Sequence, residues 1–184
     1  MGFTRKLNVQ ALPENKKENL VSAIYIGFIF ILLAALYFIN AHTDLWDIFN
    51  HFLNTFVFAQ VPGTTVQLPA PEAPWAYLVL YKAAFQFCLG IGIIEIAVLT
   101  LRVWLFSPLP RKAETIENLV FWLGTSYLVV TYLINITIIG EWFVFWAGII
   151  VIGGLSLVAR SFVLIAGRPA PPESAPEVQV KPSA

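Results

Sequence analysis

The sequence predicts an all-α polytopic membrane protein: a bundle of four transmembrane helices with an additional amphipathic helix at the extracytoplasmic interface. Three observations lead to this class. Of the 184 residues, 58% are hydrophobic and only 12% are charged, whereas soluble domains average about 45–50% and about 25%. The hydrophobic residues are gathered in runs long enough to cross a bilayer. The lysines and arginines flank these runs on one side only, with the single exception of Lys82.

The first span is expected at residues 20–39, after a polar segment at 1–19 that we assign to the cytoplasm. Its twenty uncharged residues, at ~1.5 Å each, match the ~30 Å hydrocarbon core of a bilayer. A secretory signal peptide would have a shorter apolar region, ~7–15 residues, followed by a small-residue cleavage site. No convincing cleavage site follows this run, so we expect it to be retained as a transmembrane helix.

Residues 43–60 have a helical period with two different faces. At 100° per residue the aspartates, asparagines and His51 share one arc, and large apolar side chains fill the other, with Phe58 as the one misfit. This pattern predicts an amphipathic helix that lies in the membrane interface. Its aromatic face is the candidate surface for docking a partner protein, formed by Trp46, Phe49, Phe52 and Phe56. Residues 61–74 are rich in proline and are expected to form an irregular loop.

Three further spans are expected at about 75–106, 117–138 and 142–166, which completes a membrane domain at 20–166. Pro108 and Pro110 break the chain between the second and third spans, because proline interrupts a helix. Only three residues separate the third span from the fourth, so these two are expected to form a tight antiparallel hairpin. The last segment, 167–184, is rich in proline and has no aromatic residue, which predicts a disordered cytoplasmic tail.

The basic residues predict the orientation. They lie in the N-terminal segment, around the loop between the second and third spans, and at the C-terminal end. The two opposite loops, at 40–74 and 139–141, contain aspartate and glutamate but no lysine or arginine. The positive-inside rule therefore places both termini in the cytoplasm of a multi-pass protein of the cell membrane.

Four charged residues form the candidate polar site inside the predicted spans: Lys82, Glu95, Arg102 and Arg160. The second span has polar groups on two nearly opposite faces, so it should lie in the middle of the bundle or at a junction with a partner. Glu95 is ~16 Å along the helix from Phe106, near the midplane. A carboxylate there costs a few kcal/mol, and either arginine could be its partner. Lys82 is expected to extend outward toward Glu72 or Glu141.

Small and hydroxylated residues mark the faces on which the third and fourth spans should pack. The third span has a stripe that includes Asn118, Thr125 and Asn135, and the fourth has Gly148, Gly153, Gly154 and Ser156. Such residues let helix backbones approach closely and form hydrogen bonds between helices. We interpret both stripes as packing surfaces.

Several classes of function are disfavoured. The single cysteine, Cys88, excludes a pair of redox thiols within the chain, and both histidines, His42 and His51, lie outside the spans, which disfavours a transmembrane haem. Asp47 and His51 are four residues apart, but no third ligand has a fitting spacing. No nucleotide-binding or hydrolase motif is present. We therefore expect no catalytic residue, cofactor or metal site, and no binding to nucleic acid.

The leading hypothesis from sequence is a non-catalytic membrane subunit, a structural or scaffold component of a larger complex or homo-oligomer. Its expected partners are the lipid bilayer and other membrane subunits or copies of itself, contacted through the aromatic face of residues 43–60. Under this hypothesis Glu95 fixes helix packing by an ion pair or hydrogen bond. The alternative is a small transporter or channel in which Glu95 is an intramembrane site for a proton or another cation.

Overall fold

The structure, a computed structural model, describes residues 13–167 of the chain. Its four long helices are α1 (Glu14–Ile39), α3 (Leu78–Trp104), α4 (Leu109–Leu128) and α5 (Ile139–Ala166). The segments that contain them are long and apolar enough to cross a membrane, which supports the predicted class of helical membrane protein. The predicted tail and most of the predicted N-terminal segment lie outside the described residues.

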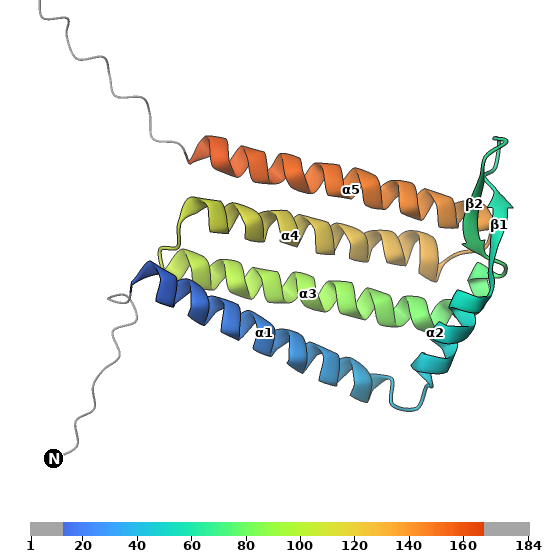
Figure 1. The fold of residues 1–184 in the computed structure, drawn as a ribbon, viewed down its shortest axis with the longest axis horizontal. Helices are drawn as coiled ribbons and strands as arrows, with labels where there is room; N and C mark the ends of the chain where they lie inside the picture. Colours follow the sequence, from blue (N-terminus) through green and yellow to red (C-terminus); the bar gives the residue numbers. More distant parts are fainter. Residues whose placement is uncertain (1–12, 168–184) are drawn as a thin grey trace, which may run out of the picture.

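The four long helices lie side by side in the order α1, α3, α4, α5 (Figure 1). Within the described chain, α1 packs against α3, α3 against α4 and α4 against α5, whereas the two edge helices, α1 and α5, do not pack against each other. The four predicted helices are therefore arranged as an open layer within the described chain. Of the two places predicted for the second span, in the middle of the bundle or at a junction with a partner, α3 has an inner place, with a long helix on each side.

Small residues allow the helices of the layer to approach closely. At each of the three interfaces a glycine backbone receives the end of a branched apolar side chain: Gly90 faces Leu32, Gly92 faces Leu123, and Gly124 faces Ile152. A Cβ added at Gly124 would lie 2.7 Å from Cδ1 of Ile152, too close for the present packing. This is the packing mode expected where lipid surrounds the helices and hydrophobicity does not drive them together.

The layer has a basic end and an acidic end. The basic end carries Arg102, Arg111, Lys112 and Arg160, where α3 and α5 end and where α4 begins. The acidic end carries α2 (Leu45–Asn54) and a β-hairpin, which lie across the ends of the helices in Figure 1. Asp44 caps α2 by accepting a hydrogen bond from the N–H of Asp47, as expected for an acidic residue before the first turn.

The helix predicted at 43–60 is wrong for its last third, residues 55–60. The chain leaves the helix at Thr55 and forms strand β1 (Phe56–Gln60), which pairs antiparallel with β2 (Gln67–Pro71). Aromatic and β-branched residues at 56–58 favour a strand, and the turn that follows includes Gly63 at a φ of 78°, which glycine adopts without strain. The misfit of Phe58 to the helical pattern was the signal for this change. The proline-rich segment at 61–74, which was predicted to be an irregular loop, therefore contains the turn and the second strand of a hairpin. A 3-10 helix, η2 (Pro74–Tyr77), follows the hairpin.

Two predicted loops are parts of helices. Helix α4 begins at Leu109, eight residues before the predicted third span, because Pro110 lies in its first turn, where a missing N–H costs nothing. It continues as a π-helical segment, η3 (Val129–Ile134). Residues 139–141 form the first turn of α5, and the Glu141 carboxylate accepts hydrogen bonds from the N–H groups of Thr137 and Ile138.

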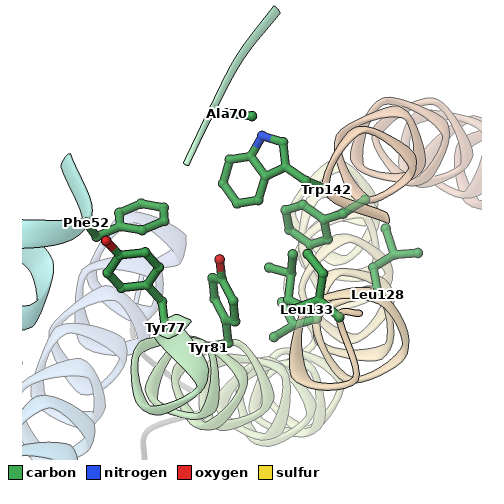
Figure 2. Packing of buried hydrophobic residues seen from close by; sticks show 10 residues of the cluster. Phe52, Ala70, Tyr77, Tyr81, Leu128, Leu133 and Trp142 are labelled. Atoms are coloured by element: carbon green, nitrogen blue, oxygen red, sulfur yellow. The ribbon is translucent and has the colours of Figure 1, made fainter. Parts of the chain in front are cut away.

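An aromatic cluster joins the acidic end to the helices. It consists of Phe52 from α2, Tyr77 from η2, Tyr81 from α3 and Trp142 from α5, all buried (Figure 2). The ring centroid of Phe52 lies 5.0 Å from that of Tyr77 and 6.0 Å from that of Trp142. The indole N–H of Trp142 donates a hydrogen bond to the carbonyl of Pro69, at 3.3 Å, which fixes the hairpin at the acidic end of the layer.

Candidate polar site around Glu95

Glu95 lies on α3, ~14 Å from the end of the helix at Trp104, and only 2% of its surface is exposed. The side chains of Tyr25 on α1 and Asn118 on α4 lie near its carboxyl and are its potential hydrogen-bond donors. Its Oε1 nevertheless has no hydrogen-bond partner among residues 13–167. The carboxyl therefore sits between three helices with part of its hydrogen-bonding capacity unused.

Arg102 was one of the two arginines expected to pair with Glu95, but in the structure it contacts other groups. Its Nη1 donates to the hydroxyl of Thr115 and to the carbonyl of Arg111, and its Nη2 lies 3.7 Å from the Glu18 carboxylate. The Arg102 side chain is only 12% exposed and Thr115 is buried. One guanidinium thus links α1, α3 and α4 at the basic end, although its Nε is buried and unpartnered in the described chain.

Arg160 and Lys82 are not brought to Glu95 either. Arg160 on α5 forms an ion pair with Glu117 on α4, with a separation of 2.9 Å, and is about half exposed. Lys82 is exposed near the acidic end, and within the part of the chain that the structure describes it forms no ion pair with Glu72 or Glu141. Of the four predicted site residues, only Glu95 and Arg102 share a site.

These two residues line a common cavity of about 250 Å³ between α1, α3 and α4. It runs from buried Glu95 to the basic end, where the side chains of Arg111 and Glu114 are 54% and 44% exposed. Hydroxyl, amide and charged groups make up much of its wall. The residues that line it are Val21, Ser22, Tyr25, Ile26, Glu95, Val98, Arg102, Arg111, Glu114 and Asn118.

Sequence reasoning missed the contribution of α1 and of the first turns of α4. A signal was present in the spacing, because Glu18, Ser22 and Tyr25 follow one another at i, i+4 and i+7, which places them on one face of a helix. Thr115 is three residues before Asn118, in a part of α4 that was predicted to be a loop. Each polar stripe looks like an ordinary solvated face until the helices are assembled.

The four residues of the predicted docking face have different surroundings. Phe52 is buried in the aromatic cluster, and the ring of Phe56 contacts the rings of Phe52 and Trp142. Trp46, Phe49 and Phe56 remain exposed, at 69%, 38% and 37%. The reason is that the chain turns into β1 after Thr55, which folds Phe56 back over the cluster. A docking role stays a prediction for the three exposed side chains, those of Trp46, Phe49 and Phe56, whereas buried Phe52 is not available to a partner.

Metal-binding chemistry of the usual kind has no support in residues 13–167, where no three histidine, cysteine, aspartate or glutamate side chains are grouped so as to hold an ion. Comparison with known proteins found no matching family model, no matching curated protein and no matching solved structure.

Proposed function

We propose that the chain is a non-catalytic, multi-pass subunit of the cell membrane that packs through helix α5 against another transmembrane subunit or a second copy of itself. The observation that supports this proposal is a row of small residues on the open side of α5. Ala147, Gly154 and Ser161 are all exposed and follow one another at intervals of seven residues. Seven residues are close to two helical turns, so the three lie on one face.

The glycines of α5 divide into used and unused positions. Gly148 contacts Leu128 of α4, so a Cβ there would lie 2.8 Å from Cδ1 of that leucine. A Cβ at Gly153 or Gly154 would meet no atom of the described chain within 4 Å. Glycine within a helix costs roughly 0.5–1 kcal/mol relative to alanine, and contact with lipid alone gives no compensation. Close approach of another helix does.

The position of α5 in the layer supports the same proposal. The helix lies at an edge, with α4 as its only long neighbour within the described chain (Figure 1). Most of its large apolar side chains are exposed, Ile150 at 77% and Phe162 at 68% among them. Exposed Trp46 and Phe49 offer a second contact at the acidic end, outside the layer.

The distribution of charge supports the orientation. Lysines and arginines occupy the basic end on α1, α3, α4 and α5. The acidic end carries Asp44, Asp47, Glu72 and Glu141, and Lys82 is the only lysine or arginine of the described chain that lies near it. By the positive-inside rule the basic end and both termini are cytoplasmic. The acidic end, with α2 and the hairpin, then lies outside.

The proposal is tested by a pair of leucine substitutions on the two edge helices. Gly154→Leu should reduce association, because its side chain fills the space that a neighbouring helix would occupy. Ala35→Leu, at an exposed position of α1, serves as the matched control and should leave association unchanged. The measurement is particle mass after extraction in mild detergent and in nanodiscs. A wild type that is always a lone monomer, or a Gly154→Leu variant that assembles normally, contradicts the proposal.

The alternative, a small transporter or channel, is supported by the cavity at Glu95. All residues that line this cavity lie between Glu95 and the basic end. A cavity that opens at one end only is suited to binding a solute from one side of the membrane. Transport of the solute across the membrane would need the cavity to continue toward the acidic end.

A further inference from the structure

The cavity at Glu95 contains one carboxyl group that forms no ion pair with an arginine or lysine of the described chain. On α4, Arg111 pairs with Glu114 at 3.1 Å. Arg102 of α3 pairs with Glu18 of α1, and beyond the cavity Arg160 of α5 pairs with Glu117. Among the charged side chains that line the cavity, Glu95 is the one that has no ion-pair partner in the described chain.

Glu95 is also the most deeply buried charged group of the site, and its Oε1 has no hydrogen-bond partner among the described residues. An ionised carboxylate in an apolar layer is strongly unfavourable unless a counter-charge or a proton compensates it. Arg102 forms no ion pair with Glu95 in the described chain, and its guanidinium lies instead against Thr115, the Arg111 carbonyl and Glu18. The site therefore requires a positive charge from elsewhere.

The surroundings of Glu95 are suited to a small hard cation. The hydroxyl of Tyr25, the amide of Asn118 and the hydroxyl of Ser22 line the same cavity and can present oxygen atoms. Hard cations prefer such oxygen ligands. A volume of about 250 Å³ also has room for water, which occupies ~30 Å³ per molecule in the liquid, so an ion could keep part of its hydration shell.

We propose that this cavity is a binding site for one small monovalent cation, a proton or an alkali ion, which enters from the basic end and binds at the carboxyl of Glu95. The entrance is formed by the exposed side chains of Arg111 and Glu114, whose ion pair leaves no net charge there. Tyr25 and Asn118 line the cavity beside this carboxyl from the two neighbouring helices. The proposal does not depend on the subunit role of α5, because it uses different helices and a different surface.

The test is chemical modification of the full chain in detergent by dicyclohexylcarbodiimide, an apolar reagent that reacts with protonated carboxyl groups. The site of modification is determined by mass spectrometry of peptides, over a series of pH values, in sodium chloride and in choline chloride at equal ionic strength. We expect Glu95 to be modified, and the yield to fall as the pH rises. Glu117, which is paired with Arg160, is the internal control and should show little modification.

The two kinds of cation give different results. If sodium but not choline protects Glu95, the occupant is an alkali ion, and Asn118→Leu should weaken this protection several-fold while Glu117 is unaffected. If the yield depends on pH alone, the occupant is a proton. Both results support the site. The proposal is overturned if Glu95 in the folded wild type is never modified, or if its modification depends on neither pH nor sodium.

Discussion

Replacement of Arg102 by methionine tests whether this side chain holds three helices together at the basic end. Methionine keeps much of the apolar stem and removes the guanidinium. In the structure that group donates hydrogen bonds to Thr115 and to the Arg111 carbonyl and forms an ion pair with Glu18. The side chains of Arg102 and Glu18 are only 12% and 18% exposed, so water does little to compensate for the loss.

The expected magnitude follows from these contacts. Hydrogen bonds to a charged group contribute ~1.5–3 kcal/mol each, and a partner left buried and unpaired costs more. The loss is reduced because the Thr115 hydroxyl also donates to the Arg111 carbonyl, at 3.0 Å, and this bond remains in the variant. We therefore expect Arg102→Met to lower the free energy of unfolding by about 2–4 kcal/mol.

Arg160→Met is the matched control. Its ion pair with Glu117 is shorter, 2.9 Å, but Arg160 is 44% exposed, and exposed pairs contribute only ~0–1 kcal/mol. Both variants are unfolded by denaturant in the same detergent micelles and followed by tryptophan fluorescence. A control that loses as much stability as Arg102→Met would refute the reasoning, because burial, not the length of the ion pair, is what distinguishes the two sites.

Two further predictions concern the acidic end and the orientation. Phe52→Ala should destabilise the protein by about 3–5 kcal/mol, the usual cost of removing a buried phenylalanine, whereas Phe49→Ala, at an exposed position, should cost little. Thermal unfolding in detergent compares the two variants. Equal losses of stability would show that the aromatic cluster does not stabilise the acidic end. In a Cys88→Ala background, an impermeant thiol reagent applied to whole cells should label Gln67→Cys, and it should label Pro108→Cys only after permeabilisation, whereas the reverse pattern would invert the proposed orientation.

The sequence by itself determined the class of protein and the approximate positions of the four long helices. Runs of apolar residues that can cross a bilayer have few alternatives, because every backbone N–H and C=O must be satisfied without water and a helix does this within a single segment. The polar groups on two faces of the second span also predicted the central place of α3. These properties are local, or nearly so, and can therefore be read along the chain.

The ends of elements were less predictable. Residues 56–60 were predicted to continue the helix, with Phe58 as the one misfit, but they form β1, because a strand at 67–71 is available to pair with them. Pro108 and Pro110 were interpreted as a break, although Pro110 in a first turn is equally compatible with the start of α4. In both places the local pattern permits two conformations, and contacts with another segment select one.

The surroundings of the candidate site were decided only by the tertiary structure. The sequence identified Glu95 and Arg102, but the open layer determined which faces of α1 and α4 meet α3. As a result Tyr25 and Asn118 lie beside the carboxyl, while Arg102 pairs with Glu18. The same packing divided the aromatic face of residues 43–60 into buried Phe52 and exposed Trp46. The physical reason is that helical periodicity fixes which side chains share a face of one helix, whereas the neighbour of that face depends on how the helices pack.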